Sequence, residues 1–169
     1  MKVMGKIEEN KWMFALTVIV CLLVGWIILF KMSFSISTLD RISGINLIPF
    51  FYDKETSFHL TEVALNVFAF IPLGLFLKLM KFDFKSSVLL GFGYSCILEI
   101  MQLILKVGIT DITDLITNTS GFVIGAAFYV MLSKIFKNTD MLDKVLKILA
   151  TIGVVLLIAF VSILIISNL

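Results

Sequence analysis

Acidic and amide side chains interrupt the long apolar stretches of this 169-residue chain at helical spacing. Glu99 and Gln102 are three residues apart, which places both on the same face of a helix. Asp111, Asp114 and Asn118 follow the same rule where the next apolar stretch begins. A charge at the centre of a membrane helix costs about 2.5 to 3.5 kcal/mol, so an acid there is paired, hydrated or protonated and indicates function. These side chains are therefore the candidates for acid–base or ligand-binding chemistry.

Five apolar runs must position these groups. Each run has 18 or 19 residues, close to the roughly 20 helical residues that cross a hydrocarbon core about 30 Å thick. The chain is also 60% hydrophobic, more than a soluble domain of this size can bury. We therefore predict an all-α, polytopic membrane helix bundle with five transmembrane helices. Their expected ranges are 12–30, 60–77, 87–105, 115–132 and 148–166. The first run also resembles a signal peptide, but its length and the lack of a small-x-small cleavage site favour a retained helix.

The basic residues are divided unevenly between the two sides of this bundle. Ten lysines lie in the N-terminal segment and in the second and fourth loops, whereas four basic residues lie on the other side. Cytoplasmic loops are enriched in Lys and Arg, so we predict a cytoplasmic N-terminus and an extracellular C-terminus. In this orientation Asn66, Glu99 and Asn118 share one depth in the outer leaflet, about 9 Å from their helix ends. The short connection 106–113 further predicts that the third and fourth helices are antiparallel neighbours.

Several of these features also have purely structural interpretations. Asp111 or Asp114 can cap the beginning of a helix. Asn66 and Asn118 can cross-link helices through hydrogen bonds without contacting a ligand. The Gly-x-x-x-Gly spacing within 121–125 favours close helix packing over a ligand site. These alternatives remain open at the level of the sequence.

The sequences of two connections between the helices lead to further predictions. The first outer loop, 31–59, contains Leu47, Ile48 and Phe50 around Pro49, and is too apolar for a freely solvated loop. We expect it to fold back onto the outer membrane face as a lid over the polar cluster. The segment 138–147 is predicted to be a cytoplasmic linker whose lysines suit anionic lipid head groups.

Nothing in the sequence indicates a cofactor, a metal site or a nucleic-acid partner. Cys21 and Cys96 both lie inside apolar runs, where a free thiol behaves as a small hydrophobic group. Their number and spacing match neither a disulfide framework nor a metal-binding motif.

Four short motifs stand out along the chain: NLIPF at 46–50, NVFAFIPLG at 66–74, EIMQL at 99–103 and DITDLITNTSGFVIG at 111–125. Together they resemble the VanZ-like family of small membrane proteins. Their order and separation are specific, and the resemblance covers about 46–136. We expect one membrane domain, 1–169, in which 137–169 adds the linker and an extra C-terminal helix. Carried over to this chain, the family's polar signature consists of Asn46, Asn66, Glu99, Gln102, Asp111, Asp114 and Asn118.

One departure from the family pattern concerns charge. Many members resemble R-x-F-D-I-D-D before the fourth helix, whereas this chain reads KVGITDITDL at 106–115. Lys106 is the nearest cation, and Thr113 stands where an acid is usual. If the arginine normally pairs with the acids, that partner is moved or missing here.

The resemblance implies a bacterial plasma-membrane protein associated with reduced susceptibility to teicoplanin-type glycopeptides. The expected partners are membrane lipids and a lipid-linked cell-wall precursor or a lipoglycopeptide, bound or shielded by the outward-facing polar residues. An alternative is a membrane enzyme in which Glu99 and Asp111 or Asp114 act as an acid–base pair or hold a divalent ion. A small transporter with Glu99 as a proton relay fits least, because the inner half shows no polar path.

Overall fold

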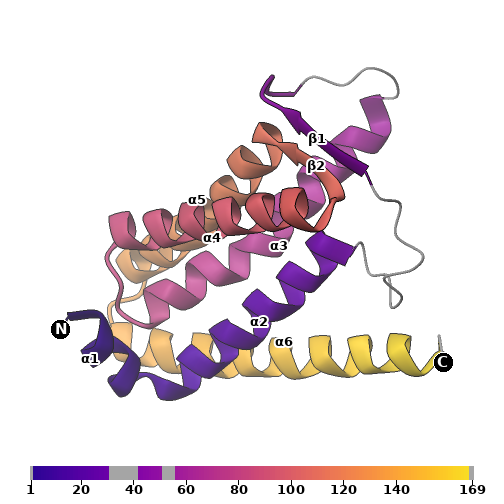
Figure 1. Cartoon of the computed structure of the whole chain (residues 1–169). Coiled ribbons are helices and arrows are strands. Elements are labelled where there is room, and N and C mark those ends of the chain that lie inside the picture. The colour runs from indigo at the N-terminus through magenta and orange to yellow at the C-terminus, as the bar shows by residue number, and fades with distance from the viewer. Residues whose placement is uncertain (1, 31–41, 51–55, 168–169) are drawn as a thin grey trace.

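A computed structural model describes residues 2–30, 42–50 and 56–167, which form six helices and two short strands (Figure 1). The helices are α1 (Lys2–Glu9), α2 (Lys11–Phe30), α3 (Thr56–Leu79), α4 (Phe84–Leu105), α5 (Ile112–Ile135) and α6 (Thr139–Ser167). The strands are β1 (Ile42–Asn46) and β2 (Val107–Asp111). Five helices, α2 to α6, are long and apolar enough to cross a membrane. The chain is therefore a multi-pass membrane protein, and the prediction of an all-α bundle with five spans is confirmed.

Helices α3 and α5 form the closest helix pair of the bundle. A Cβ atom at Gly121 or Gly125 would overlap with backbone atoms of α3, including the carbonyl oxygens of Val67 and Ile71. A Cβ atom at Gly74 of α3 would overlap with the backbone of α5. The two backbones are in direct contact because these positions lack side chains. The packing interpretation of the 121–125 motif is thus confirmed.

Helix α4 packs beside α5, as the short connection between them predicted. Gly91 of α4 lies against the ring of Phe122, which also stacks at a tilt on Phe70 of α3 with ring centroids 5.5 Å apart. Phe70 is fully buried. The core between α3, α4 and α5 is thus aromatic at this level, which lies about two helical turns before Glu99 on α4.

The last helix begins earlier than the sequence predicted. Residues 139–147, expected to form a linker, are the first turns of α6. Three of these residues, Leu142, Asp143 and Leu146, are buried against the bundle, whereas most of the later part of α6 is exposed. Figure 1 shows α6 extending along the outside of the bundle, where its apolar surface would face lipid.

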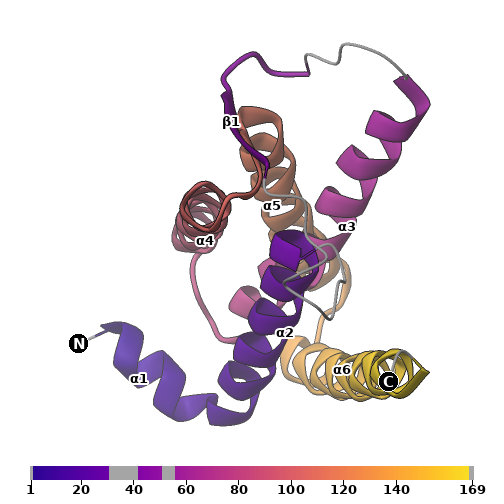
Figure 2. The same ribbon diagram turned by 45° about the vertical axis from the view of Figure 1, so that its right-hand side comes forward.

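A two-stranded parallel sheet, which the sequence did not predict, joins the first outer loop to the α4–α5 connection. Ile42 pairs with Val107 and Asn46 pairs with Asp111, in continuous register. Figure 1 shows both strands, and Figure 2 shows β1, at the end of the bundle remote from the N-terminus and the beginning of α6. We call this the strand end.

The opposite end, which we call the lysine end, contains the beginnings of α2, α4 and α6 and the last residues of α3 and α5. The lysines in the connections and adjoining helix ends include Lys11, Lys78, Lys81, Lys85, Lys134, Lys137, Lys144 and Lys147. The bundle therefore keeps most of its basic residues at one end and the candidate site at the other.

Candidate functional site

Asp111 lies where β2 ends and α5 begins, and its carboxylate has two partners. One oxygen accepts a hydrogen bond from the backbone N–H of Thr113 (2.7 Å), which makes Asp111 the N-cap of α5. The other accepts from the amide Nδ2 of Asn46 (3.0 Å). The strand register places Asn46 directly opposite Asp111. The capping interpretation is therefore confirmed for Asp111, and the same carboxylate also holds the first outer loop.

The segment after β1 is tied down over this helix start. The Oδ1 atom of Asn46 accepts from the backbone N–H of Ile48 (3.1 Å), an Asx turn that precedes Pro49. The backbone N–H of Phe50 donates to Oγ1 of Thr113 (3.0 Å). Leu47, Ile48 and Phe50 remain exposed. Residues 46–50 thus lie against the candidate site, as expected for a lid, whereas 31–41 and 51–55 of the same loop lie outside the described residues.

Glu99 is the most deeply placed acid of the site, with 4% of its surface exposed. Its Oε2 atom accepts a hydrogen bond from the backbone N–H of Asp111 (2.9 Å). Its backbone carbonyl accepts from Oγ1 of Thr110 (3.1 Å), so two consecutive residues of the α4–α5 connection fasten onto Glu99. The Oε1 atom has no hydrogen-bond partner in the described structure. One carboxylate oxygen is therefore held in place and the other is free to receive a donor.

Gln102 and Asn118 resemble Glu99 in that one side-chain atom is hydrogen-bonded and the other has no partner among the described residues. The Nε2 atom of Gln102 makes a long hydrogen bond (3.5 Å) to the carbonyl of Ile28 in α2. The Nδ2 atom of Asn118 donates to Oγ of Ser95 in α4 (3.1 Å). Both side chains are buried, and the carbonyl oxygen of each has no partner among the described residues. We call Glu99, Gln102 and Asn118 the buried acceptors.

Asn66 and Asp114 form a separate pair. The Nδ2 atom of Asn66 in α3 donates to Oδ1 of Asp114 in the first turn of α5 (2.7 Å). Both residues are half-buried, as are Asn46 and Asp111. We call these four residues the polar rim. The hydrogen bonds of Asn66 and Asn118 show that both cross-link helices, as the structural interpretation predicted.

The structure thus distributes the seven predicted site residues over two levels. Asn46, Asp111 and Glu99 form one connected network. Asn66 is hydrogen-bonded to Asp114 in the first turn of α5. Asn118 contacts Ser95, and Gln102 contacts the backbone of Ile28. Sequence reasoning missed the supporting hydroxyls, which belong to Ser95, Thr110 and Thr113. Ser95 lies four residues before Glu99 on α4, and this spacing was the available signal.

Lys106, the nearest cation in the sequence, does not neutralise these acids. It is the C-cap of α4, with a left-handed backbone (φ 56°) and its N–H bonded to the carbonyl of Gln102. Its side chain is exposed and forms no ion pair with any described residue. In the described ranges, no group of three or more His, Cys, Asp or Glu side chains is arranged to hold a metal ion.

We predict that replacing Ser95 by Ala weakens the α4–α5 contact by about 0.6 to 2 kcal/mol. The substitution removes the partner of Asn118 Nδ2 in a fully buried position, and interhelical hydrogen bonds in membranes contribute about this much. A double-mutant cycle with Asn118→Ala, read out as unfolding midpoints in detergent, measures the pairwise term. Additive effects of the two substitutions would contradict the hydrogen bond.

A multi-pass helical membrane protein with a polar site between three spans is the class that this architecture defines. The family model for VanZ/LLP1 matches residues 17–134, and the chain belongs to the VanZ/LLP1 family. The chain is 34% identical over 142 residues to Protein VanZ of Enterococcus faecium, covering 80% of this chain and 83% of that protein. The family match begins at residue 17, not near residue 46 as we expected, so it includes most of α2. No solved structure matches the chain.

Proposed function

We propose that the chain binds or shields a lipid-linked cell-envelope ligand through the polar rim and the buried acceptors. The observation that carries this proposal is the set of three buried oxygens without donors, Glu99 Oε1, Gln102 Oε1 and Asn118 Oδ1. A buried polar atom without a partner costs about 1 to 3 kcal/mol. Hydroxyl or ammonium groups of a ligand would supply the missing donors, which suits sugars and amines.

The surroundings of the polar rim support a lipid-linked ligand. The exposed side chains of Leu47, Ile48 and Phe50 lie beside Asn46, and Ile109 of β2 is also exposed. A head group recognised by amides and carboxylates would therefore lie next to apolar side chains that suit its lipid chain. Because 46–50 covers the start of α5, ligand entry would require this segment to shift.

The family supplies the biological setting of this proposal. The VanZ-like family is associated with reduced susceptibility to teicoplanin-type glycopeptides, and a relative named Protein VanZ is 34% identical. We propose the same effect here, with a lipoglycopeptide or a lipid-linked cell-wall precursor as the ligand. Both present their polar parts at the outer membrane face, where the lysine distribution would place the strand end.

This orientation makes a labelling prediction. A single cysteine at Ile109 in a background without Cys21 and Cys96 should react in intact cells with a membrane-impermeant maleimide. A single cysteine at Lys85 or Lys137 should react only after permeabilisation, because the lysine end would face the cytoplasm. All three positions are exposed, so their reactivity reports the side of the membrane. The reverse pattern would overturn the proposed orientation.

The proposed function is tested by expression in a glycopeptide-susceptible Gram-positive host. We expect the minimal inhibitory concentration of teicoplanin to rise at least fourfold, and that of a glycopeptide without a lipid chain to rise less. Lipids that co-purify with the protein, identified by native mass spectrometry, would name the envelope ligand. Unchanged susceptibility at confirmed membrane levels of the protein would contradict the proposal.

A second function, a membrane-embedded enzyme, is favoured by one feature of Glu99. Its carboxylate is buried, fixed through Oε2 by the backbone of Asp111, and open at Oε1. This is the arrangement that an acid or base needs in order to act on a substrate proton, with Asp111 or Asp114 as its partner. Release of a modified lipid or antibiotic product by the purified protein would support the enzyme over the binder.

A further inference from the structure

A groove of about 650 Å³ lies at the lysine end, between the beginnings of α2 and α6. Its volume falls in the range of about 300 to 1,000 Å³ that is typical of ligand sites. The walls combine Lys144 and Lys147 with the apolar side chains of Trp12, Ile148 and Ile152. The candidate functional site at the strand end contributes none of these residues.

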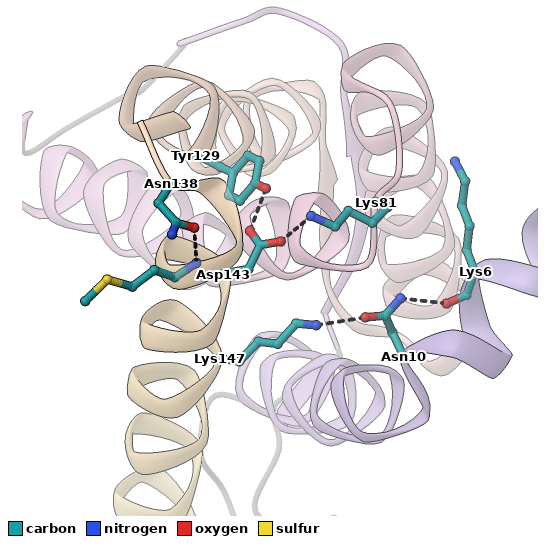
Figure 3. Close-up of polar contacts among 8 residues, drawn as sticks. Lys6, Asn10, Lys81, Tyr129, Asn138, Asp143 and Lys147 are labelled. Carbon is teal, nitrogen blue, oxygen red and sulfur yellow. Dashed lines mark hydrogen bonds and ion pairs between the residues drawn. The ribbon is translucent and has the colours of Figure 1, made fainter. Parts of the chain in front are cut away.

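The acidic residues of the groove are only partly available to balance its lysines. Asp143 accepts a hydrogen bond from the hydroxyl of Tyr129 (2.6 Å) and forms an ion pair with Lys81 (Figure 3). The hydrogen bond that Lys81 donates to the Asp143 carboxylate raises the pKa of Lys81 above its usual value, so Lys81 stays cationic at this contact. Asp140 is the other acid of the lining.

The other two lysines of the groove, Lys144 and Lys147, form no ion pair with a described residue. Lys147 donates to the neutral Oδ1 atom of Asn10 (2.9 Å), which fixes its position without cancelling its charge (Figure 3). Lys144 is exposed and has no hydrogen bond or ion pair within the described ranges. With Lys81 and Asp143 paired, two lysines face one aspartate, Asp140, and the groove carries a net positive charge.

The groove also has the residue pattern that is typical of a membrane interface. The indole of Trp12 donates to Oγ1 of Thr151 (3.1 Å) while 63% of the residue remains exposed. Tryptophans at this position are typical of the head-group region. Beyond Lys147 on α6, Ile148 and Ile152 are exposed and lead into the apolar span. The lining thus changes along α6 from cationic to apolar, as a phospholipid does from its head group to its chains.

We propose that this groove binds an anionic phospholipid of the leaflet at the lysine end. The phosphate would lie between Lys144 and Lys147, and one acyl chain would follow Ile148 and Ile152. Basic pockets between membrane helices bind such head groups. Binding would hold the first part of α6 against α2, to which Thr151 is joined by the hydrogen bond from Trp12, and against Asn10 just before α2, which accepts from Lys147.

The test uses the fluorescence of Trp12 in the full chain. Of the two tryptophans, Trp26 is replaced by Phe, so that Trp12 is the sole reporter. The protein is reconstituted in phosphatidylcholine vesicles with a small fraction of lipid brominated on its acyl chains, either phosphatidylglycerol or phosphatidylcholine. We expect brominated phosphatidylglycerol to quench Trp12 at much lower mole fraction than brominated phosphatidylcholine.

Two double variants separate the groove from general surface charge. Lys144→Gln with Lys147→Gln should lower the preference for phosphatidylglycerol by about 30-fold, from roughly fivefold for each lysine. Lys85→Gln with Lys137→Gln removes the same charge from exposed positions outside the groove and should retain the preference. Size-exclusion profiles and thermal midpoints establish that both variants are folded.

Three results would overturn the proposal. The first is equal quenching by the two brominated lipids in the parent protein. The second is an equal loss of preference in both double variants, which would mean a delocalised surface effect. The third is abolition of the preference by inorganic phosphate at constant ionic strength, which would make free phosphate and not lipid the ligand.

Discussion

Replacing Glu99 by Gln is expected to weaken ligand binding by roughly 10- to 150-fold and to remove most of the teicoplanin phenotype. The substitution preserves shape, and the amide oxygen of Gln can still accept the hydrogen bond from the backbone of Asp111. It places an NH₂ donor where the buried, unpartnered Oε1 atom now lies. Losing a hydrogen bond to a charged group costs about 1.5 to 3 kcal/mol, which gives the stated range.

The measurements for Glu99→Gln are inhibitory concentrations in the expressing host and ligand dissociation constants of the purified protein. Glu9→Gln is the matched control, because Glu9 is an exposed acid at the end of α1, far along the chain from the candidate site. A partly retained teicoplanin phenotype in Glu99→Gln supports binding. Complete loss of the phenotype with retained ligand affinity supports the enzyme alternative. A parallel fall in phenotype and membrane level would mean that Glu99 is required only for folding.

Replacing Gly125 by Ala is expected to destabilise the bundle by roughly 3 kcal/mol, the upper part of the range for overpacked interiors. The new Cβ atom would overlap with the carbonyl oxygen of Ile71 and would come within 2.9 Å of the backbone nitrogen of Leu75. A backbone atom cannot rotate away as a side chain can, so α3 and α5 would have to separate. The unfolding midpoint in detergent, followed by fluorescence-detected size exclusion, measures this effect.

The chain contains two matched controls for this substitution. Gly93 of α4 and Gly153 of α6 have open space where a Cβ atom would be added. Ala at either position should be neutral or should stabilise by up to about 1 kcal/mol, because Ala is the better helix former. If Gly125→Ala were as stable as these controls, α3 and α5 would not be in backbone contact.

The five spans could be predicted from the sequence because a bilayer imposes its thickness on every helix that crosses it. Apolar runs of 18 or 19 residues meet that requirement locally, without reference to the rest of the chain. The same reasoning identified Glu99, Asn66 and Asn118 as polar groups of neighbouring helices, since lipid disfavours them elsewhere. The spacing of Gly121 and Gly125 predicted close helix packing, whereas only the structure showed that α3 is the partner.

Tertiary structure decided how these groups are satisfied. Asn46 and Asp111 are 65 residues apart, and only the pairing of β1 with β2 brings the amide onto the carboxylate. Strands of five residues at a membrane surface leave too weak a periodicity to be recognised beside the helical signal. Likewise, the buried oxygens of Glu99, Gln102 and Asn118 lack donors because of how three helices pack, which no local pattern encodes. The sequence determined by itself which residues must leave the lipid, because solvation acts on each residue separately, whereas hydrogen bonding depends on partners that only the folded chain brings together.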